Sequence, residues 1–358
     1  MKVRALTYFT SGVSDWSRDG VKRVVERGID VLERARDAVE DTGVEVWTLR
    51  ISLPEMPTDA DFGRVAEAVL DSVDVAKYLV SLGGVYVGRA SAREIAEACA
   101  RGLYLPILGL WLDPPRWSSW VSKVLHEVAE LSPEACTRLG AVLGMKPIET
   151  PYFPLSTSSR LEGLGIAYLY VDLVRDHLEG RVSVESISRR LSAVLEALRS
   201  SAAAKRVVAD YSLSPWMESS VAELIELMGC RVPELGTLYA IHRLNQLIEK
   251  VASLSGSAAG FNEVMLPYAE DSRLRELGAS GALSARHFLE MASACLAGID
   301  MVVLPRDVEK LRGLILDAFA IARSKGRPLG LRAVPAAEEP GQLVDLGRFG
   351  AVAAISYE

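Results

Sequence analysis

Two adjacent carboxylates stand where an apolar segment gives way to a helical pattern. The stretch VMLPYAEDSRLREL, residues 264–277, begins as a buried strand would, is interrupted by Pro267, and then presents Glu270 and Asp271 side by side. Paired carboxylates at the carboxyl end of a strand can bind Mg²⁺ or divide acid–base work between them. The structural alternative is that Asp271 caps the following helix while Glu270 is solvated. Glu270 is harder to explain as a cap, so it is the stronger candidate for chemistry.

A second polar group follows an apolar segment at residues 205–213. In the sequence DYSLSP, Asp210 could serve as a third acid, base or metal ligand, and Ser212 and Ser214 supply hydroxyl groups. Hydroxyls placed just before a helix can bind an anion together with the helix dipole and its free N–H groups. Ser214 could equally be the N-cap of a helix that has Pro215 in its first turn. The two interpretations are compatible.

Three segments place arginine on strands that look buried. They are RALTY with Arg4 and Thr7, TLRIS with Arg50, and LRAVP with Arg332. A buried arginine needs a partner, because a lone charge in the protein interior costs several kcal/mol. The partner is either one of the carboxylates at 270 and 271 or the acidic group of a ligand, which a guanidinium can hold with two parallel hydrogen bonds.

Other segments narrow the range of functions. The stretch ETPYFP, residues 149–154, suits a pocket wall or lid, or alternatively a rigid connector. The four histidines all lie in helical patterns beside charged residues, which favours surface positions. The sequence contains no HExxH, P-loop, GxGxxG or GxSxG motif, which argues against zinc peptidases, P-loop NTPases, Rossmann dehydrogenases and serine hydrolases.

Composition indicates a globular cytoplasmic protein. The chain has 358 residues, 49% of them apolar, and a net charge of −7 with acids and bases intermixed. No basic block marks a nucleic-acid surface, and no apolar run is long enough to suggest a membrane span. Cys99, Cys136, Cys230 and Cys295 form no CxxC pair, and no signal peptide is evident at residues 1–10. Arginine strongly outnumbers lysine, which is compatible with a thermophilic source.

Strand and helix patterns alternate along the chain, with about ten candidate strands. Among the predicted strands are residues 3–10, 44–52, 77–88, 103–112, 205–213, 260–268, 300–305, 329–335 and 351–358. Their apolar runs are continuous, as in parallel strands buried on both faces. Helices are expected over 117–143, 158–179 and 184–201, and from Pro215 onward. Because no linker divides the chain, residues 1–358 are predicted to form a single α/β barrel domain; an eight-stranded barrel with two added strands is the alternative.

The C-terminal half resembles a known family. The matching segments are DYSLSPWMESSVAELIELMG (210–229), GTLYAIHRLNQLIEK (236–250), AGFNEVMLPYAED (259–271), LSARHFLEMASACLAGIDMVVLP (283–305) and LRAVP (331–335). In order and spacing they resemble the uncharacterised DUF711 family, also called UPF0210. The opening MKVRALTYFT and the stretch ETPYFPLSTS look like its archaeal branch. The resemblance implies a ten-stranded α/β barrel similar to the pyruvate formate-lyase-like glycyl radical enzymes, and it implies no particular reaction.

The resemblance also has departures. Bacterial members carry a His-Gly-Thr-Thr stretch, of which this chain retains Gly236 and Thr237 but has Leu235 in place of the histidine. Radical chemistry is not expected, because Arg348 and Gly350 match an Arg-x-x-Gly pattern only with one spacer residue missing. No cysteine lies on a predicted loop tip.

Two functional hypotheses follow. In the first, the protein is a small-molecule enzyme in which Glu270, Asp271 and Asp210 act as acid, base or ligands of a divalent metal. The anionic substrate would be held by Arg4, Thr7, Arg50, Ser212, Ser214, Gly236, Thr237 and Arg332. In the second, the same pocket binds a metabolite without catalysis, which would be favoured if arginines occupy the acids. A homodimer is a further expectation, since helices such as 160–178 have apolar residues on several sides.

Overall fold

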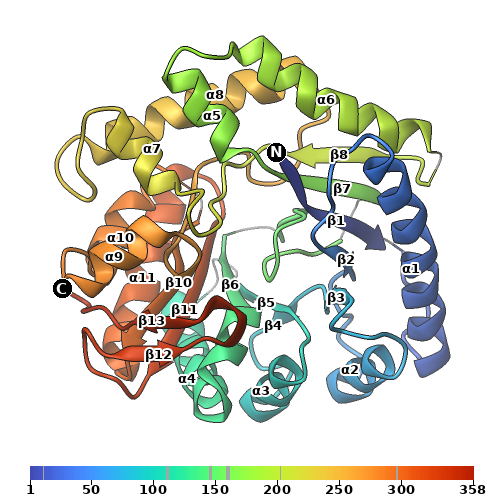
Figure 1. The fold of residues 1–358 in the computed structure, drawn as a ribbon. Coiled ribbons are helices and arrows are strands. Elements are labelled where there is room, and N and C mark those ends of the chain that lie inside the picture. Colours follow the sequence, from blue (N-terminus) through green and yellow to red (C-terminus); the bar gives the residue numbers. More distant parts are fainter. Residues whose placement is uncertain (11, 110–112, 145–146, 159–161, 202, 296) are drawn as a thin grey trace.

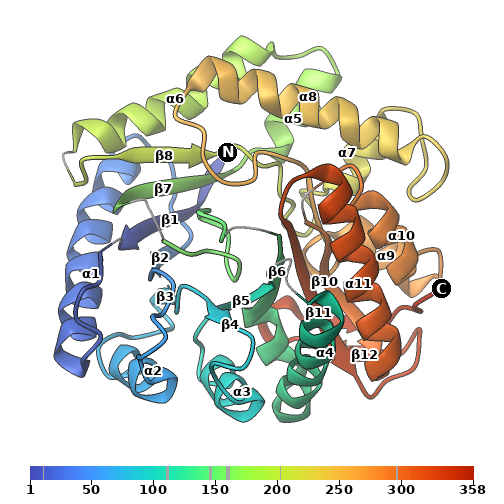
Figure 2. The ribbon, with the colours of Figure 1, turned by 180° about the vertical axis from the view of Figure 1, so that it is seen from behind.

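The computed structural model describes residues 1–358 except 11, 110–112, 145–146, 159–161, 202 and 296. The fold is mixed α/β, with the strands inside and the helices around the outside (Figures 1 and 2). No described helix is both long enough and apolar enough to cross a membrane.

The first sheet has five strands in the order β3-β2-β1-β7-β8. Their bounds are β1 Lys2–Thr10, β2 Leu49–Ser52, β3 Tyr78–Ser81, β7 Glu162–Leu169 and β8 Val207–Asp210. Strands β1, β2 and β3 are parallel, β7 is antiparallel to β1, and β8 is parallel to β7. The β1–β2 register places Thr7 opposite Arg50.

The second sheet has six strands in the order β4-β5-β6-β11-β10-β9. Their bounds are β4 Val85–Tyr86, β5 Leu105–Gly109, β6 Leu139–Leu143, β9 Met265–Pro267, β10 Ala297–Pro305 and β11 Leu329–Ala336. The sheet changes direction between β6 and β11, which are antiparallel. A separate two-stranded hairpin pairs β12, Leu343–Asp345, with β13, Ala351–Ala353.

Single parallel bridges link the edges of the two sheets. Ser81 at the end of β3 pairs with Tyr104 just before β5, and Leu213 after β8 pairs with Val264 just before β9. Both pairs of sheet edges therefore come within hydrogen-bonding distance of each other.

The helices cover the outer faces of the strands (Figure 1). The α-helices are α1 Arg18–Glu40, α2 Phe62–Leu70, α3 Ala92–Ala100, α4 Pro114–Leu131, α5 Val171–Leu178, α6 Val184–Ser200, α7 Val221–Leu227, α8 Thr237–Ser255, α9 Ser272–Ala279, α10 Ala285–Met291 and α11 Val308–Lys325. Short 3₁₀ turns are η1 Pro133–Arg138, η2 Tyr268–Glu270 and η3 Gly347–Phe349. Their inward faces are apolar and pack on the continuous apolar strands, which places one large core between helices and sheets.

The segment between β6 and β7 enters the interior rather than running over the surface (Figure 1). Residues 150–158 of it are buried. The Pro151 carbonyl accepts hydrogen bonds from Thr7 Oγ1 at 3.3 Å and Arg50 Nη1 at 2.9 Å. Thr150 Oγ1 donates to Asp210 at 2.8 Å. Because its own polar groups are bonded to the surrounding strands, this segment is a fixed part of the interior.

Three predicted helices need correction. Residues 162–169 form strand β7, and the helix starts only at Val171. Likewise 139–143 is strand β6, since Pro133 ends the preceding helix region. Both misassigned segments are short apolar runs buried on both faces, which periodicity cannot assign. The third helix begins at Val221 with Ser220 as its cap, and not at Pro215.

Other local predictions hold in part. At the start of α3, Ser91 forms a capping box with Glu94. The predicted strand 77–88 is two strands, because Gly83 and Gly84 adopt positive φ between them. A Cβ at Gly83 would lie 2.0 Å from the Pro54 carbonyl oxygen, so the chain passes too closely there for any other residue. The last strand covers only Ala351–Ala353 of 351–358, and 110–112 of the segment 103–112 lie outside the described residues.

Candidate functional site: an arginine-lined cavity

A small cavity between the two sheets collects four of the charged side chains that lie on described strands. Its volume is about 30 Å³, which is close to the space of one water molecule. It is lined by Arg4, Arg50, Arg332, Arg348, Glu270 and Asp300, together with Leu79, Tyr104, Tyr152, Phe153, Pro154, Leu155, Ser214, Met265 and Pro267. We call it the arginine cavity.

A chain of ion pairs crosses the cavity. Arg4 on β1 forms an ion pair with Glu270 in η2, and its Nη1 donates to the Pro215 carbonyl at 2.8 Å. Arg332 on β11 lies 3.3 Å from the other Glu270 oxygen and 2.6 Å from Asp300 Oδ1 on β10. Both carboxylates are therefore engaged by arginine.

Arg50 on β2 is different, because it forms no ion pair with any described carboxylate. It is only 7% exposed. Its Nε donates to Thr48 Oγ1 at 2.9 Å, its Nη1 donates to the Pro151 carbonyl, and its guanidinium lies 5.2 Å from the centre of the Phe153 ring. Burial, together with the like charges of Arg4 and Arg348, lowers the pKa of Arg50 to about 9. A guanidinium in this position lacks a counter-charge.

Arg348 adds a second unneutralised cation at the edge of the cavity. It lies in η3, on the turn of the C-terminal hairpin, is exposed to solvent, and donates to Tyr104 Oη at 3.3 Å. The cavity thus combines four guanidinium groups with two carboxylates, an excess of two positive charges. Such an excess in a confined site attracts anions.

The pKa values of the two carboxylates of the cavity are shifted in opposite directions. Burial acts to raise the pKa of Glu270, but Arg4, Arg332 and Arg348 outweigh it and hold that pKa below its ordinary value. Burial raises the pKa of Asp300, and Arg332 offsets only part of that effect. Glu270 is therefore firmly ionised, whereas Asp300 is the more readily protonated group of the pair.

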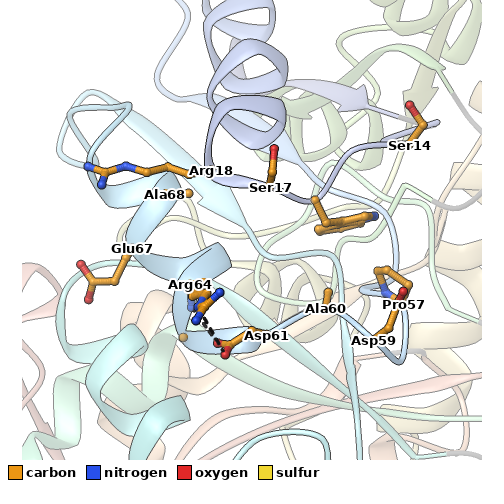
Figure 3. A pocket seen from close by; sticks show the side chains of 12 residues that line it. Ser14, Ser17, Arg18, Pro57, Asp59, Ala60, Asp61, Arg64, Glu67 and Ala68 are labelled. Carbon is orange, nitrogen blue, oxygen red and sulfur yellow. Dashed lines mark hydrogen bonds and ion pairs between the residues drawn. The ribbon is translucent and has the colours of Figure 1, made fainter.

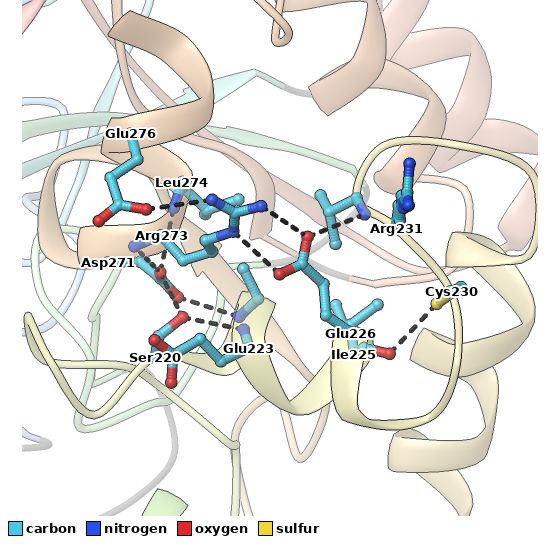
Figure 4. Close-up of polar contacts among 12 residues, drawn as sticks. Ser220, Glu223, Ile225, Glu226, Cys230, Arg231, Asp271, Arg273, Leu274 and Glu276 are labelled. Carbon is cyan, nitrogen blue, oxygen red and sulfur yellow. Dashed lines mark hydrogen bonds and ion pairs between the residues drawn. The ribbon is translucent and has the colours of Figure 1, made fainter. Parts of the chain in front are cut away.

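Asp271, next in sequence, faces away into a different set of contacts (Figure 4). Its carboxylate accepts from Ser220 Oγ and from four backbone N–H groups, those of residues 221 and 222 at the start of α7 and 273 and 274 at the start of α9. It is the N-cap of α9 and also binds the first two N–H groups of α7, which Ser220 caps. We call this set of contacts the Asp271 network. The capping alternative for Asp271 is confirmed.

Asp210 is also fully engaged. It accepts hydrogen bonds from Ser212, Thr150 and the backbone N–H groups of Phe261 and Asn262. It therefore ties the buried 148–158 segment to the loop before β9. Burial raises its pKa, and these donors oppose the shift.

The remaining predicted binding residues divide between the cavity and elsewhere. Ser214 lines the cavity, and its Oγ lies 3.3 Å from Tyr152 Oη. Thr7 and Ser212 do not line the cavity. The Thr7 hydroxyl donates to the Pro151 carbonyl, and the Ser212 hydroxyl donates to Asp210. Gly236 and Thr237 form the start of α8, away from the cavity.

Four polar lining residues were not among the predicted site residues: Asp300, Arg348, Tyr104 and Tyr152. Asp300 interrupts the apolar run DMVVLP, and a carboxylate inside a buried strand was a usable signal. Tyr152 lies in the stretch already considered as a pocket wall. Arg348 was noticed only for its spacing from Gly350, and nothing local connects it to β1 or β11.

A larger surface cavity of about 890 Å³ lies between the starts of α1 and α2 (Figure 3). Four of its five charged lining residues form ion pairs: Arg18 pairs with Asp71 at 2.7 Å, Arg64 with Asp61 at 3.8 Å, and Glu67 with Arg101. The fifth is Asp59, so among the described lining residues this cavity offers no unpaired cation for an anionic ligand.

Neither a metal centre nor a reactive thiol appears at the arginine cavity. Among the described residues, no group of three or more His, Cys, Asp or Glu side chains is arranged to hold a metal ion. No cysteine lines the cavity. Cys99 and Cys136 are buried, and burial raises the pKa of the Cys99 thiol to about 12, which suppresses its thiolate form.

Comparison with known proteins identifies the family. The family described as "Uncharacterised ACR (DUF711)" matches residues 119–347, which include η2, β10 and β11 and hence Glu270, Asp300 and Arg332. The chain belongs to the DUF711 family. This agrees with the resemblance seen in the C-terminal segments.

Curated relatives are UPF0210 proteins. One from Methanopyrus kandleri is 28% identical over 353 residues, covering 90% of this chain and 72% of the relative. One from Pyrobaculum aerophilum is 26% identical over 383 residues, covering 90% and 82%. One from Pyrobaculum arsenaticum is 32% identical over 148 residues, covering 40% and 33%. None of these names states an activity, and archaeal or thermophilic origin of this chain stays a prediction.

Proposed function

We propose that this DUF711 protein binds a small anionic metabolite in the arginine cavity. The observation that carries the proposal is Arg50: a buried guanidinium without an ion-pair partner among the described residues. Leaving such a charge unpaired costs stability, and a carboxylate or phosphate group would remove that cost with two parallel hydrogen bonds.

The ligand would enter between Arg50 and Arg348. Arg4 and Arg332 are already held by Glu270 and Asp300, so the two remaining guanidinium groups carry the charge that is not neutralised. A cavity of about 30 Å³ requires side-chain movement for anything larger than water. Arg348 is suited to that movement, because it is exposed and lies on a hairpin turn. Tyr152 and Ser214 would add hydroxyl groups at the opposite wall.

Catalysis is the second candidate, and one observation favours it. The pKa of Asp300 is raised while that of Glu270 is lowered, and Arg332 bridges the two carboxylates. Opposite shifts in one site are how enzymes separate an acid from a base. Under this alternative Asp300 would exchange a proton with the bound anion. We favour binding over catalysis because both acids already form ion pairs with arginine.

We also propose that the two sheets form one ten-stranded barrel around this site, with β3 and β4 counted as one interrupted strand beside β5, in a single domain of residues 1–358. The bridges Ser81–Tyr104 and Leu213–Val264 support closure of the two sheets at both edges. In that barrel, the parallel strands of the group containing β1 would run antiparallel to the parallel strands of the group containing β11. The two groups meet at the antiparallel pairs β1–β7 and β6–β11.

A thermal-shift panel tests the binding proposal. Phosphate, sulfate and small mono- and dicarboxylates would be added to wild type, Arg50→Met and Arg18→Met at constant ionic strength. Arg18 is a matched control, since it is an exposed arginine paired with Asp71. At least one anion should raise the melting temperature of wild type and Arg18→Met but not of Arg50→Met. Equal shifts in all three proteins would refute the assignment.

A further inference from the structure

A second cavity, of about 810 Å³, lies outside the fold's centre beside α8. Its walls come from α8, the segment 256–263 that follows it, Ser293 and Ala294 after α10, Lys325 at the end of α11, and Arg327. Figure 2 views the side on which that segment passes β8, where Ala209 and Ala258 form a bridge. We call it the Glu263 cavity.

Glu263 is buried in the wall of this cavity, with one oxygen left over. The residue is 8% exposed. Its Oε1 forms an ion pair with Arg327, whereas its Oε2 is buried and has no hydrogen-bond partner among the described residues. A buried carboxylate oxygen without a hydrogen-bond donor destabilises the fold. Such an oxygen therefore binds either a water molecule or a ligand that can donate a hydrogen bond.

Lys325 lies close to that oxygen without reaching it. Its Nζ is 3.9 Å from Glu263 Oε2 and donates instead to the carbonyls of Ala292 at 3.1 Å and Cys295 at 2.8 Å. An ammonium group has three N–H donors, and these two carbonyls accept from two of them. The third N–H of Lys325 is left for an acceptor placed near Lys325 Nζ and Glu263 Oε2. A hydroxyl oxygen placed there could donate to Oε2 and accept from Nζ, because hydroxyls do both. A second ammonium group would be repelled by Lys325.

Arg327 provides an anion partner at the mouth of the same cavity. Its side chain is half exposed, and its two partners among the described residues, Glu263 Oε1 and the Phe261 carbonyl at 3.3 Å, use only part of a five-donor guanidinium. Two cations face one carboxylate at this point, which leaves one positive charge for a ligand. The remaining donors suit a carboxylate group.

We propose that the Glu263 cavity binds a small 2-hydroxy carboxylate. The hydroxyl lies between Glu263 Oε2 and Lys325 Nζ, and the carboxylate lies against Arg327. In such a ligand the two groups are carried on adjacent carbons, which matches Lys325 and Arg327 each facing one oxygen of the same carboxylate. The proposal does not rest on anion binding in the arginine cavity, since the two sites share no charged residue.

Matched ligand pairs test it. L-malate and D-malate against succinate, and lactate against propionate, differ only in the hydroxyl group. Calorimetric titration of the full chain is done in the Arg50→Met background, which is expected to weaken binding at the arginine cavity. We expect each favoured hydroxy acid to bind at least about tenfold more tightly than its deoxy partner, because the analogue leaves Glu263 Oε2 unbonded. Glu263→Gln should abolish that ratio, while Glu309→Gln, a control at an exposed glutamate of α11 outside this cavity, should retain it.

Hydrogen exchange on Arg50→Met provides a readout should Glu263→Gln fail to fold. The favoured hydroxy acid should protect amides in 256–263, and its deoxy partner should not. Equal affinity within every pair, or absence of binding, would overturn the proposal and leave a bridging water as the occupant of the gap.

Discussion

Glu270 lies among guanidinium groups in the arginine cavity, whereas its chain neighbour Asp271 lies among backbone N–H groups in the Asp271 network. Asp271 has five donors for its two oxygens and needs no further partner. Around Glu270 the imbalance is reversed, because four arginines face two carboxylates. A buried polar group whose hydrogen bonds are all made within the protein stabilises the fold, whereas a buried charge without an ion-pair partner favours binding of a ligand of opposite charge. Glu270 and Asp271 are adjacent in sequence and both carry a carboxylate, yet one lies in a charged cavity and the other caps a helix.

The largest effect should come from breaking the Asp271 network. Asp271→Ala removes the cap of α9 and the acceptor for the first two N–H groups of α7, whose own cap Ser220 remains. We expect a loss of about 3–4 kcal/mol in unfolding free energy, from one cap, two further buried N–H groups and a buried hydroxyl. Urea denaturation measures it. Asp271→Asn keeps one carbonyl oxygen and should lose about half as much. A loss below about 1 kcal/mol for the alanine variant would mean that solvent can replace these contacts.

Glu270→Gln should be less destabilising and should change binding in the opposite sense. Arg4 and Arg332 lose a charged partner but keep a hydrogen-bond acceptor, so we expect a loss of about 2 kcal/mol. With one negative charge fewer in the cavity, affinity for the anion found in the thermal-shift panel should rise about tenfold. Denaturation and calorimetry on the same preparation test both parts. Weaker anion binding in this variant would instead place Glu270 in direct contact with the ligand.

Acid titration should sharpen the comparison further. The arginines lower the pKa of Glu270, so its stabilising contribution is present above the pKa of an unfolded glutamate and is lost as pH falls through the folded value. Burial raises the pKa of Asp271, so the stability linked to its protonation is present below the unfolded pKa and is lost as pH rises through the folded value.

Denaturation of wild type, Glu270→Gln and Asp271→Asn between neutral pH and about pH 3.5 checks these signs. On acidification, the stability difference between wild type and Glu270→Gln should shrink, while that between wild type and Asp271→Asn should grow. Parallel pH profiles for the two variants would contradict the difference in their surroundings.

Arg348→Met should have the smallest effect on stability, within about 0.5 kcal/mol, because the residue is exposed. Its removal should nevertheless weaken anion binding several-fold and increase the dissociation rate, as the guanidinium closes the mouth of the cavity. Stopped-flow measurements with the identified anion separate the two rate constants. Unchanged dissociation would remove Arg348 from the binding site.

Part of this arrangement could be predicted from sequence. A buried strand arginine requires an opposite charge, which correctly suggested Glu270 as a structural partner of Arg4 and Arg332. The sequence could not decide which of the two adjacent carboxylates would face them. That choice depends on the η2 turn, which directs Glu270 inward and leaves Asp271 at the start of α9.

Long-range register limited the remaining predictions. Strands β6 and β7 were taken for helix because short runs such as LGAVL and GIAYL are apolar on both faces, and only pairing with β5, β11, β1 and β8 identifies them. Tyr152 and Arg348 reach the cavity from segments that are distant in sequence from β1. Gly236 and Thr237 were included on resemblance alone, and the structure places them at the start of α8.

The central claim is that Arg50 is a buried cation held ready for an anionic ligand. Calorimetric titration of wild type and Arg50→Met with the most stabilising anion of the panel tests it most directly. The account predicts one site per chain in wild type and at least about tenfold weaker binding in Arg50→Met, which itself should be no less stable than wild type without ligand. Equal dissociation constants, or a strongly destabilised Arg50→Met, would show that Arg50 serves only the structure.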